Sequence, residues 1–209
     1  MTTLRILGKP ISINVRKVLW LCDELALPCE LEAWGAGYRD PDTPEFRALN
    51  PNAMVPVIVD GDAVLWESNT ICRYLAGRQG RDDLLPRAPL PRARVEQWMD
   101  WQGGDLNNAW RYAYMNLVRH SPAHPDAQAV AASAASWNRH MAILERQLEK
   151  AGGFVAGPAF SLADIGLGLS VNRWLMTPIE RPALPHVQAY YERLATRPGF
   201  RRHGCNGHP

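Results

Sequence analysis

The stretch L-G-K-P-I-S-I-N-V-R-K-V-L-W, residues 7–20, joins a short apolar strand to a helix through a polar turn. Gly8 and Pro10 end the strand, and Ser12 and Asn14 stand at the mouth of the helix. A helix N-terminus leaves backbone N–H groups unpaired and carries a partial positive charge, so it favours an anion. The stretch therefore has two interpretations. Ser12 or Asn14 only caps the helix, or a Ser12 hydroxyl donates to a bound thiolate and lowers the pKa of that thiol.

The first 80 residues mix strands and helices. The helix after Asn14 is expected to be amphipathic, because its apolar residues recur at the spacing of one helix face: Val15, Val18, Leu19, Cys22, Leu25 and Ala26. A second strand is expected over residues 29–34, and a helical turn near Phe46. Asp60-Gly61 lies between two apolar runs and predicts a hairpin with a type I′ turn. A further helix is expected from Ser68, which gives the order β-α-β, loop, β-β-α.

After residue 80 the composition and the predicted secondary structure both change. Residues 81–92, R-D-D-L-L-P-R-A-P-L-P-R, hold three prolines and many charges, which indicates a linker. Residues 93–209 predict helices alone, over residues 93–119, 127–150, 161–175 and 184–196. Gly103-Gly104 is expected to weaken the first of these helices locally. The sequence thus predicts an α/β domain over residues 1–80 and an all-α domain over residues 93–209.

Composition narrows the classes of function. The 209 residues carry a net charge of +2, with 46% hydrophobic and 21% charged residues, which is ordinary for a soluble globular protein. No basic patch favours nucleic acid, and no apolar run is long enough to span a bilayer. The first ten residues do not resemble a signal peptide, so a cytoplasmic protein is expected.

The four cysteines predict no metal or redox site. None of them forms a C-x-x-C pair, and their spacing fits neither a zinc site nor a dithiol redox motif. Cys22 and Cys72 fall on apolar helix positions, where a buried and inert thiol is expected.

Two further motifs lie at the ends of strands. In Met54-Val55-Pro56, proline stands at a strand start, where it is tolerated because it cannot donate to a ladder. A cis bond there would turn the N–H and C=O of Val55 outward, like a strand edge that awaits a peptide. In W-E-S-N, residues 66–69, Ser68 is a natural N-cap and Glu67 in the first turn would suit the helix dipole. Alternatively, Ser68 and the helix N-terminus hold a carboxylate while Glu67 holds an ammonium group, as the α-amino end of an amino acid requires.

A last motif, S-L-A-D at residues 161–164, has the form of a capping box with aspartate in the glutamate position. The helix after it is apolar on nearly every side, so it is expected to be buried. The motif is therefore predicted to be structural.

Together these motifs resemble the cytosolic glutathione transferase family, and most of all its bacterial, serine-using, theta-like members. The resemblance covers essentially the whole chain: S-x-N-V-R at residues 12–16, N-P-x-x-x-V-P at 50–56, E-S at 67–68 and S-L-A-D at 161–164. It implies a thioredoxin-like first domain and a helical second domain, a homodimer, and glutathione as co-substrate without a metal.

The resemblance also implies roles for individual residues. Pro56 should follow a cis bond, Val55 should pair with the cysteinyl backbone of glutathione, and Met54 should lie beside it. Glu67 and Ser68 should hold the γ-glutamyl end. Ser12 matches the activating serine, and Asn14 is the alternative donor to the sulfur. The acceptor cleft should lie between the domains, with Trp110, Arg111, Tyr114 and Trp34 as its candidate residues, although core or dimer packing explains Trp110 and Tyr114 equally well.

The implied activity is attack of the glutathione thiol on small apolar electrophiles, as in detoxification. The same thiolate would also serve an isomerase, a dehalogenase or a peroxidase. A non-catalytic binding module is the alternative of another class, because fold does not fix function. The electrophile itself cannot be named from the sequence.

Overall fold

The computed structural model describes residues 3–209, and its first part is a four-stranded mixed sheet with three helices. The elements follow the predicted order: β1 (Leu4–Leu7), α1 (Ile13–Glu24), β2 (Cys29–Glu32), α2 (Pro44–Leu49), β3 (Val57–Asp60), β4 (Ala63–Trp66) and α3 (Ser68–Arg78). The strands lie in the order β2-β1-β3-β4, with β1 parallel to β2 and antiparallel to β3. This is the expected thioredoxin-like arrangement.

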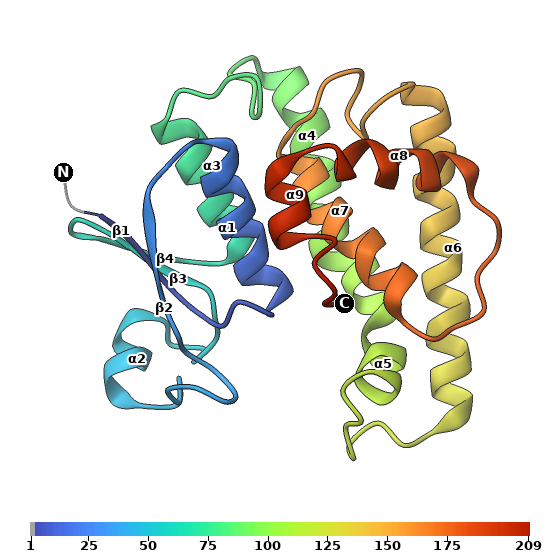
Figure 1. Cartoon of the computed structure of the whole chain (residues 1–209), viewed down its shortest axis with the longest axis horizontal. Helices are drawn as coiled ribbons and strands as arrows, with labels where there is room; N and C mark the ends of the chain where they lie inside the picture. Colours follow the sequence, from blue (N-terminus) through green and yellow to red (C-terminus); the bar gives the residue numbers. More distant parts are fainter. Residues whose placement is uncertain (1–2) are drawn as a thin grey trace.

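The two faces of the sheet pack against different helices, because side chains alternate along each strand. Ile6, paired with Ile58, belongs to the main core, which includes α1 and α3. The next residue, Leu7, belongs instead to a small cluster with Val57 and Phe46 of α2. Successive side chains of a strand point to opposite faces, so α1 and α3 cover one face of the sheet and α2 covers the other (Figure 1). The face with α1 and α3 is the one turned to the second domain.

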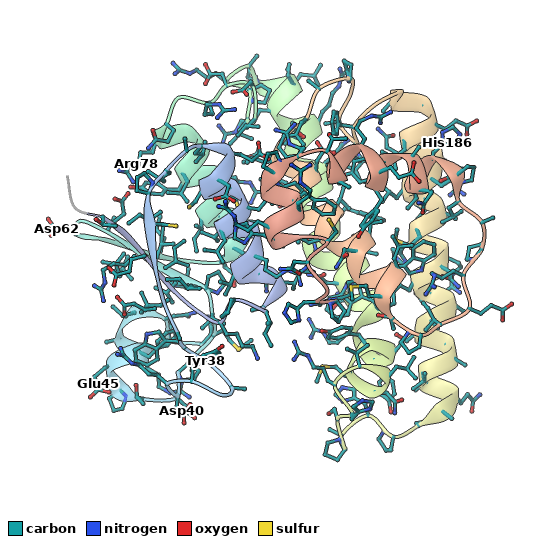
Figure 2. All side chains as sticks on the ribbon, viewed as in Figure 1. Tyr38, Asp40, Glu45, Asp62, Arg78 and His186 are labelled. Atoms are coloured by element: carbon teal, nitrogen blue, oxygen red, sulfur yellow. The ribbon has the colours of Figure 1, made fainter. Side chains whose placement is uncertain are left out.

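The hairpin forms as predicted, but its turn is of another type. Asp60 pairs with Ala63, so Gly61 and Asp62 are the turn residues. Gly61 has φ +61°, while Asp62 is not among the residues with positive φ. A type I′ turn needs positive φ at both positions, so the prediction of that turn type was wrong. Figure 2 shows Asp62 at the outer tip of the hairpin, on the side away from the helical domain.

The second part of the chain is helical throughout the described residues. Its elements are α4 (Pro89–Trp101), η1 (Gln102–Leu106), α5 (Asn107–Leu117), α6 (Ala127–Ala151), α7 (Leu162–Met176), α8 (Pro185–Ala195) and α9 (Pro198–His203). Helix α4 begins at Pro89, inside the segment 81–92 that we predicted to be a linker. Proline is well tolerated in the first turn of a helix, so the last prolines of that segment start the helix. The short helix α9 was not predicted.

The glycine pair changes the helix it lies in. Gly103 and Gly104 fall inside η1, a π-helical turn between α4 and α5. Such turns are rare and often mark functional sites. The first residue of η1, Gln102, is 1% exposed, so this turn directs an amide side chain into the protein.

Helix α7 is buried, as the sequence predicted. It is apolar on nearly every side and is buried from Leu162 to Trp174. Glycine allows the close approach of its neighbours, because a Cβ on Gly168 would lie 2.6 Å from Leu194 and 3.2 Å from Trp20. The capping box of residues 161–164 is present at its start.

Helix α1 binds the end of the described chain through Arg16, which is fully buried. The Arg16 guanidinium donates to the main-chain oxygens of four residues, at 2.6–3.2 Å: His203, Gly204, His208 and Pro209. Burial lowers the pKa of Arg16 to about 10. Arg16 thus holds the end of α9 and the segment after it against helix α1.

Candidate functional site

One cavity gathers most of the side chains that the sequence singles out for binding. It measures about 310 Å³ and opens between the first turn of α1, the loop before β3 and the start of α3. Its lining residues are Asn14, Asn50, Asn52, Met54, Val55, Pro56, Glu67 and Ser68. A larger hollow of about 580 Å³ lies at the other end of α1, against α9, and holds none of the predicted site residues.

Two polar residues stand at the start of α1. Ser12 is the N-cap residue by position, yet its side chain makes no capping hydrogen bond. Asn14, in the first turn, lines the cavity and accepts a hydrogen bond from Ser68 at 3.3 Å through Oδ1. Ser12 thus holds the N-cap position, as one of the two interpretations expected, but its hydroxyl makes no capping hydrogen bond and it is not among the residues that line the cavity.

The loop before β3 presents main-chain polar groups to the cavity. The Val55–Pro56 peptide bond is cis. Neither the N–H nor the C=O of Val55 bonds to another part of the chain within residues 3–209. Asn50 supports this loop, because its Nδ2 donates to the main-chain oxygen of Met54 at 2.7 Å. Val55 is thus a short strand edge without a partner.

The start of α3 differs from the prediction. Glu67, not Ser68, is the N-cap residue, and Ser68 is the first residue of the helix. Glu67 has φ +70°, a conformation that is strained for a residue with a side chain. Its carboxylate is exposed at the cavity, whereas Ser68 is 6% exposed. Strain of this kind persists where the surrounding structure fixes the backbone, and it clusters at binding sites.

The charges of the cavity suit a zwitterion. The N-termini of α1 and α3 both reach it, through Asn14 and Ser68, and each brings unpaired N–H groups and partial positive charge. A carboxylate fits there. The Glu67 carboxylate beside them fits an ammonium group, and the free Val55 edge fits a peptide. The arrangement can therefore hold an extended peptide that ends in an α-amino acid.

Sequence reasoning missed several residues that build this site. Asn50 and Asn52 line the cavity, and Asn52 donates to Asn50 Oδ1 through both its N–H and its side chain. Asn50 stands in the N-P-x-x-x-V-P motif, so a signal for it existed. Lys17, which lies behind Ser68, gave no signal in the pattern of α1.

The four residues predicted for an acceptor cleft do not come together. Trp110 and Tyr114 form an edge-to-face pair on α5, 5.3 Å between ring centroids, and both are buried. Arg111 is exposed on the same helix. Trp34 packs 4.9 Å from Phe46 in the small cluster on the α2 side of the sheet.

Other kinds of site have no support among the described residues. Within residues 3–209, no three His, Cys, Asp or Glu side chains gather as metal ligands would. No helix in the same range combines the length and the apolarity that crossing a membrane requires. Cys22 and Cys72 are buried as expected, and burial raises the pKa of the Cys72 thiol to about 12.

Comparison with known protein families matches both parts of the chain. Residues 7–83 match the family described as "Glutathione S-transferase, N-terminal domain". Residues 127–193 match "Glutathione S-transferase, C-terminal domain".

Individual relatives match along nearly the whole chain. Glutathione S-transferase GstB of Escherichia coli K12 is 36% identical over 197 residues, which cover 93% of this chain and 94% of the relative. Glutathione S-transferase 3 of Zea mays is 33% identical, with 97% and 93% covered. The crystal structure of a theta class glutathione S-transferase from Xanthomonas axonopodis pv. citri, with glutathione bound, superposes with a TM-score of 0.87 at 38% identity and covers 97% of each chain.

Proposed function

The chain belongs to the glutathione S-transferase family, and from that premise we propose that it binds glutathione in the cavity between α1 and α3 and activates its thiol. One observation carries the proposal. Six residues that the sequence assigned to glutathione or its thiol line a single cavity, although they come from three separate segments of the chain.

Each part of the tripeptide has a partner in this proposal. The cysteinyl main chain pairs with the free N–H and C=O of Val55, in the manner of an added strand. The γ-glutamyl carboxylate lies at the N-terminus of α3, where Ser68 Oγ and the helix N–H groups receive it. The γ-glutamyl ammonium group pairs with Glu67. Met54, 64% exposed beside this edge, covers the peptide.

The thiol then lies at the N-terminus of α1. We assign the hydrogen bond to the sulfur to Ser12, because its hydroxyl is not used for capping. The Asn14 side chain is already engaged with Ser68, which favours a role in holding Ser68 in place. A donor at the sulfur and the partial positive charge of the helix both favour the thiolate, so the thiol pKa falls.

The reaction needs only this thiolate and an electrophile. The thiol proton leaves to water, the sulfur attacks an electron-poor carbon, and a carbon–sulfur bond forms. With an aryl chloride as acceptor, the carbon–chlorine bond breaks and chloride leaves. The protein lowers the barrier by holding the nucleophile in its ionised form and in a fixed place.

Further parts of the proposal rest on the family alone. We propose that the protein is a cytoplasmic homodimer that takes part in detoxification, with a glutathione domain over residues 1–80 and a helical domain over residues 93–209. The acceptor cleft would lie between them, near Trp110, Arg111 and Tyr114 of α5, and without Trp34, which packs on the α2 side of the sheet. Side-chain movement would have to open this cleft, because Trp110 and Tyr114 are buried.

The test is conjugation of glutathione to a chlorodinitrobenzene, followed by the absorbance of the product, together with calorimetric binding of glutathione. Wild type should bind glutathione and form the conjugate, and Ser12→Ala should bind but lose most of kcat. Binding without conjugation of any electrophile would favour a non-catalytic module. Chloride release, isomerisation or peroxide reduction in place of conjugation would assign the same thiolate to one of those reactions. Absence of glutathione binding would overturn the proposal.

A further inference from the structure

Lys17 is a buried cation directly behind the proposed glutathione site. The side chain is 2% exposed. Its Nζ donates to Gln102 Oε1 at 2.8 Å, to Asn69 Oδ1 at 3.1 Å and to Ser68 Oγ at 3.5 Å. All three acceptors are neutral, so the hydrogen bonds are satisfied while the charge is not.

The groups around Lys17 leave this charge without a counter-ion. No carboxylate lies within ion-pair distance of Nζ in the described part of the chain. Burial is the largest effect and lowers the pKa of Lys17 to about 8. Cys72 of α3 and Glu67 just before α3 act to raise the pKa of Lys17, whereas Arg173 of α7 and Arg73 of α3 act to lower it. A buried ammonium group of this kind is costly unless an anion approaches it.

Ser68 connects Lys17 to the cavity. Its Oγ accepts from Lys17 Nζ and lies 3.3 Å from Asn14 Oδ1, to which it donates. Hydrogen bonds in a chain strengthen one another, so a donor to Oγ makes the Ser68 hydroxyl a better donor in turn. That hydroxyl can rotate from Asn14 to a carboxylate at the N-terminus of α3.

The second domain fixes the ammonium group in place. Gln102, at the start of the π-helical turn, donates to Ser170 of α7 at 3.0 Å and to Asn107 at 3.1 Å. These bonds orient its oxygen toward Lys17. Gly166 leaves room for this contact, because a Cβ there would lie 3.0 Å from Gln102 Oε1. Lys17 is thus held from both domains, and it acts on the site without touching it.

We propose that Lys17 is a positioning residue whose buried ammonium group supplies the counter-charge for the γ-glutamyl carboxylate of glutathione, through Ser68. This inference rests on the proposed function and adds a residue to it. A carboxylate that approaches Lys17 favours its charged form. Binding should therefore raise the pKa of Lys17, and at pH values near 8 the protein should take up a proton as it binds the ligand.

The experiment measures proton uptake by calorimetry in two buffers with different ionisation enthalpies. The ligand is S-methylglutathione, which has no thiol proton to release. Wild type, Lys17→Met and a surface control, Lys150→Met, are compared at about pH 8 and at about pH 6, where Lys17 is already protonated. The ligand ammonium group beside Glu67 also takes up protons near pH 8, so the difference between wild type and Lys17→Met isolates the contribution of Lys17.

Wild type and Lys150→Met should take up more protons than Lys17→Met at the higher pH and equal amounts at the lower pH. Lys17→Met should also bind on the order of 10-fold more weakly at about pH 6, since a charge partner is lost. Equal proton uptake in wild type and Lys17→Met at about pH 8, or equal affinity at about pH 6, would overturn the inference. Absence of S-methylglutathione binding at both pH values would instead overturn the proposed function on which it rests.

A change in the ligand tests the same point without a variant, in case Lys17→Met does not fold. In this S-methylated analogue, a γ-aminobutyryl group replaces the γ-glutamyl group, so the amine remains and the α-carboxylate is absent. Its binding to wild type should be weaker, and its proton uptake near pH 8 should be smaller than that of S-methylglutathione. Equal proton uptake with both ligands would contradict a role for Lys17 at the carboxylate.

Discussion

Replacement of Asp164 should destabilise the protein far more than loss of an ordinary helix cap. Asp164 is fully buried. Its Oδ1 accepts from Val155 N–H and from the Tyr190 hydroxyl, both at 3.0 Å, and its Oδ2 accepts from Ser161 N–H at 2.8 Å and from Ser161 Oγ at 3.0 Å. One carboxylate thus joins the start of α7 to helix α8 and to the loop that precedes α7.

The magnitude follows from the groups left behind in Asp164→Ala. The two hydroxyls can turn to other acceptors, but the buried N–H groups of Val155 and Ser161 cannot. Each of these two unsatisfied groups costs about 1–3 kcal/mol, which gives a total of about 2–6 kcal/mol. At about 2–4 °C per kcal/mol for a chain of this size, the Tm should fall by about 10 °C.

The assay is urea unfolding followed by circular dichroism, with reversibility checked by refolding. Asp126→Ala is the matched control. Asp126 caps α6 in the same way, and accepts from Gln128 N–H at 2.8 Å and Ala129 N–H at 3.3 Å, but it is exposed and water can replace it. The control should lose about 0.5–2 kcal/mol. Equal losses in the two variants would refute the reasoning, because burial would then add nothing.

Three further predictions concern stability and affinity. Burial lowers the pKa of Lys17 to about 8, so between pH 8 and 10.5 the unfolded chain binds that proton more tightly than the folded protein does. The free energy of unfolding of wild type, measured in urea, should therefore rise by up to about 3 kcal/mol relative to that of Lys17→Met over this pH range. Glu67→Gln should weaken glutathione binding on the order of 5-fold by calorimetry, since the ammonium group loses an exposed charge partner, and should leave unfolding unchanged. Gly168→Ala should cost about 1–3 kcal/mol in urea unfolding, because its Cβ meets Leu194 at 2.6 Å. The control Gly104→Ala, where a Cβ meets nothing within 4 Å, should lose no stability.

Much of the fold could be predicted because its elements bury one patterned face. Val15, Val18 and Cys22 repeat at helix spacing, and all three are buried on α1. The capping box at Ser161 and Asp164 likewise made the start of α7 predictable. Helix α9 could not be found, because its six residues include two arginines and one histidine and have no apolar repeat. Packing of Phe200 against Trp20, 4.9 Å between centroids, holds it in place.

Other differences between the sequence prediction and the structure arise where tertiary structure overrides the local preference of a residue. Glu67 has a backbone conformation that glutamate disfavours, so no propensity could assign it as the N-cap in place of Ser68. Arg16 and Lys17 are polar residues on a helix that the sheet covers on one side and the second domain on the other. Their burial depends on acceptors more than 50 residues away in sequence, at Ser68, Gln102 and the segment after α9. No periodicity within α1 can reveal such partners.

The candidate site was predictable through its motifs and not through its geometry. The residue types at 12–14, 54–56 and 67–68 suggested an anion site, a strand edge and a zwitterion site. Asn14 shares one cavity with residues 54–56 and 67–68 because the sheet places β3 beside β1 and so brings the loop before β3 close to the start of α1. The acceptor residues were chosen from helix spacing alone, and spacing cannot separate an aromatic core pair such as Trp110 and Tyr114 from the wall of a cleft.

The most direct test of the account is an ultraviolet titration of glutathione bound to the protein, in which thiolate absorbance is followed against pH. A free thiol of this type has a pKa of about 8.5. Wild type should lower that value, and Ser12→Thr should preserve the lowered value because it keeps the hydroxyl. Ser12→Ala should raise the pKa back toward that of the free thiol, with only the contribution of the helix N-terminus left. A lowered pKa that is unchanged in Ser12→Ala would contradict the assignment of Ser12 as the donor to the sulfur. An unshifted thiol in wild type would contradict the claim that this site activates glutathione.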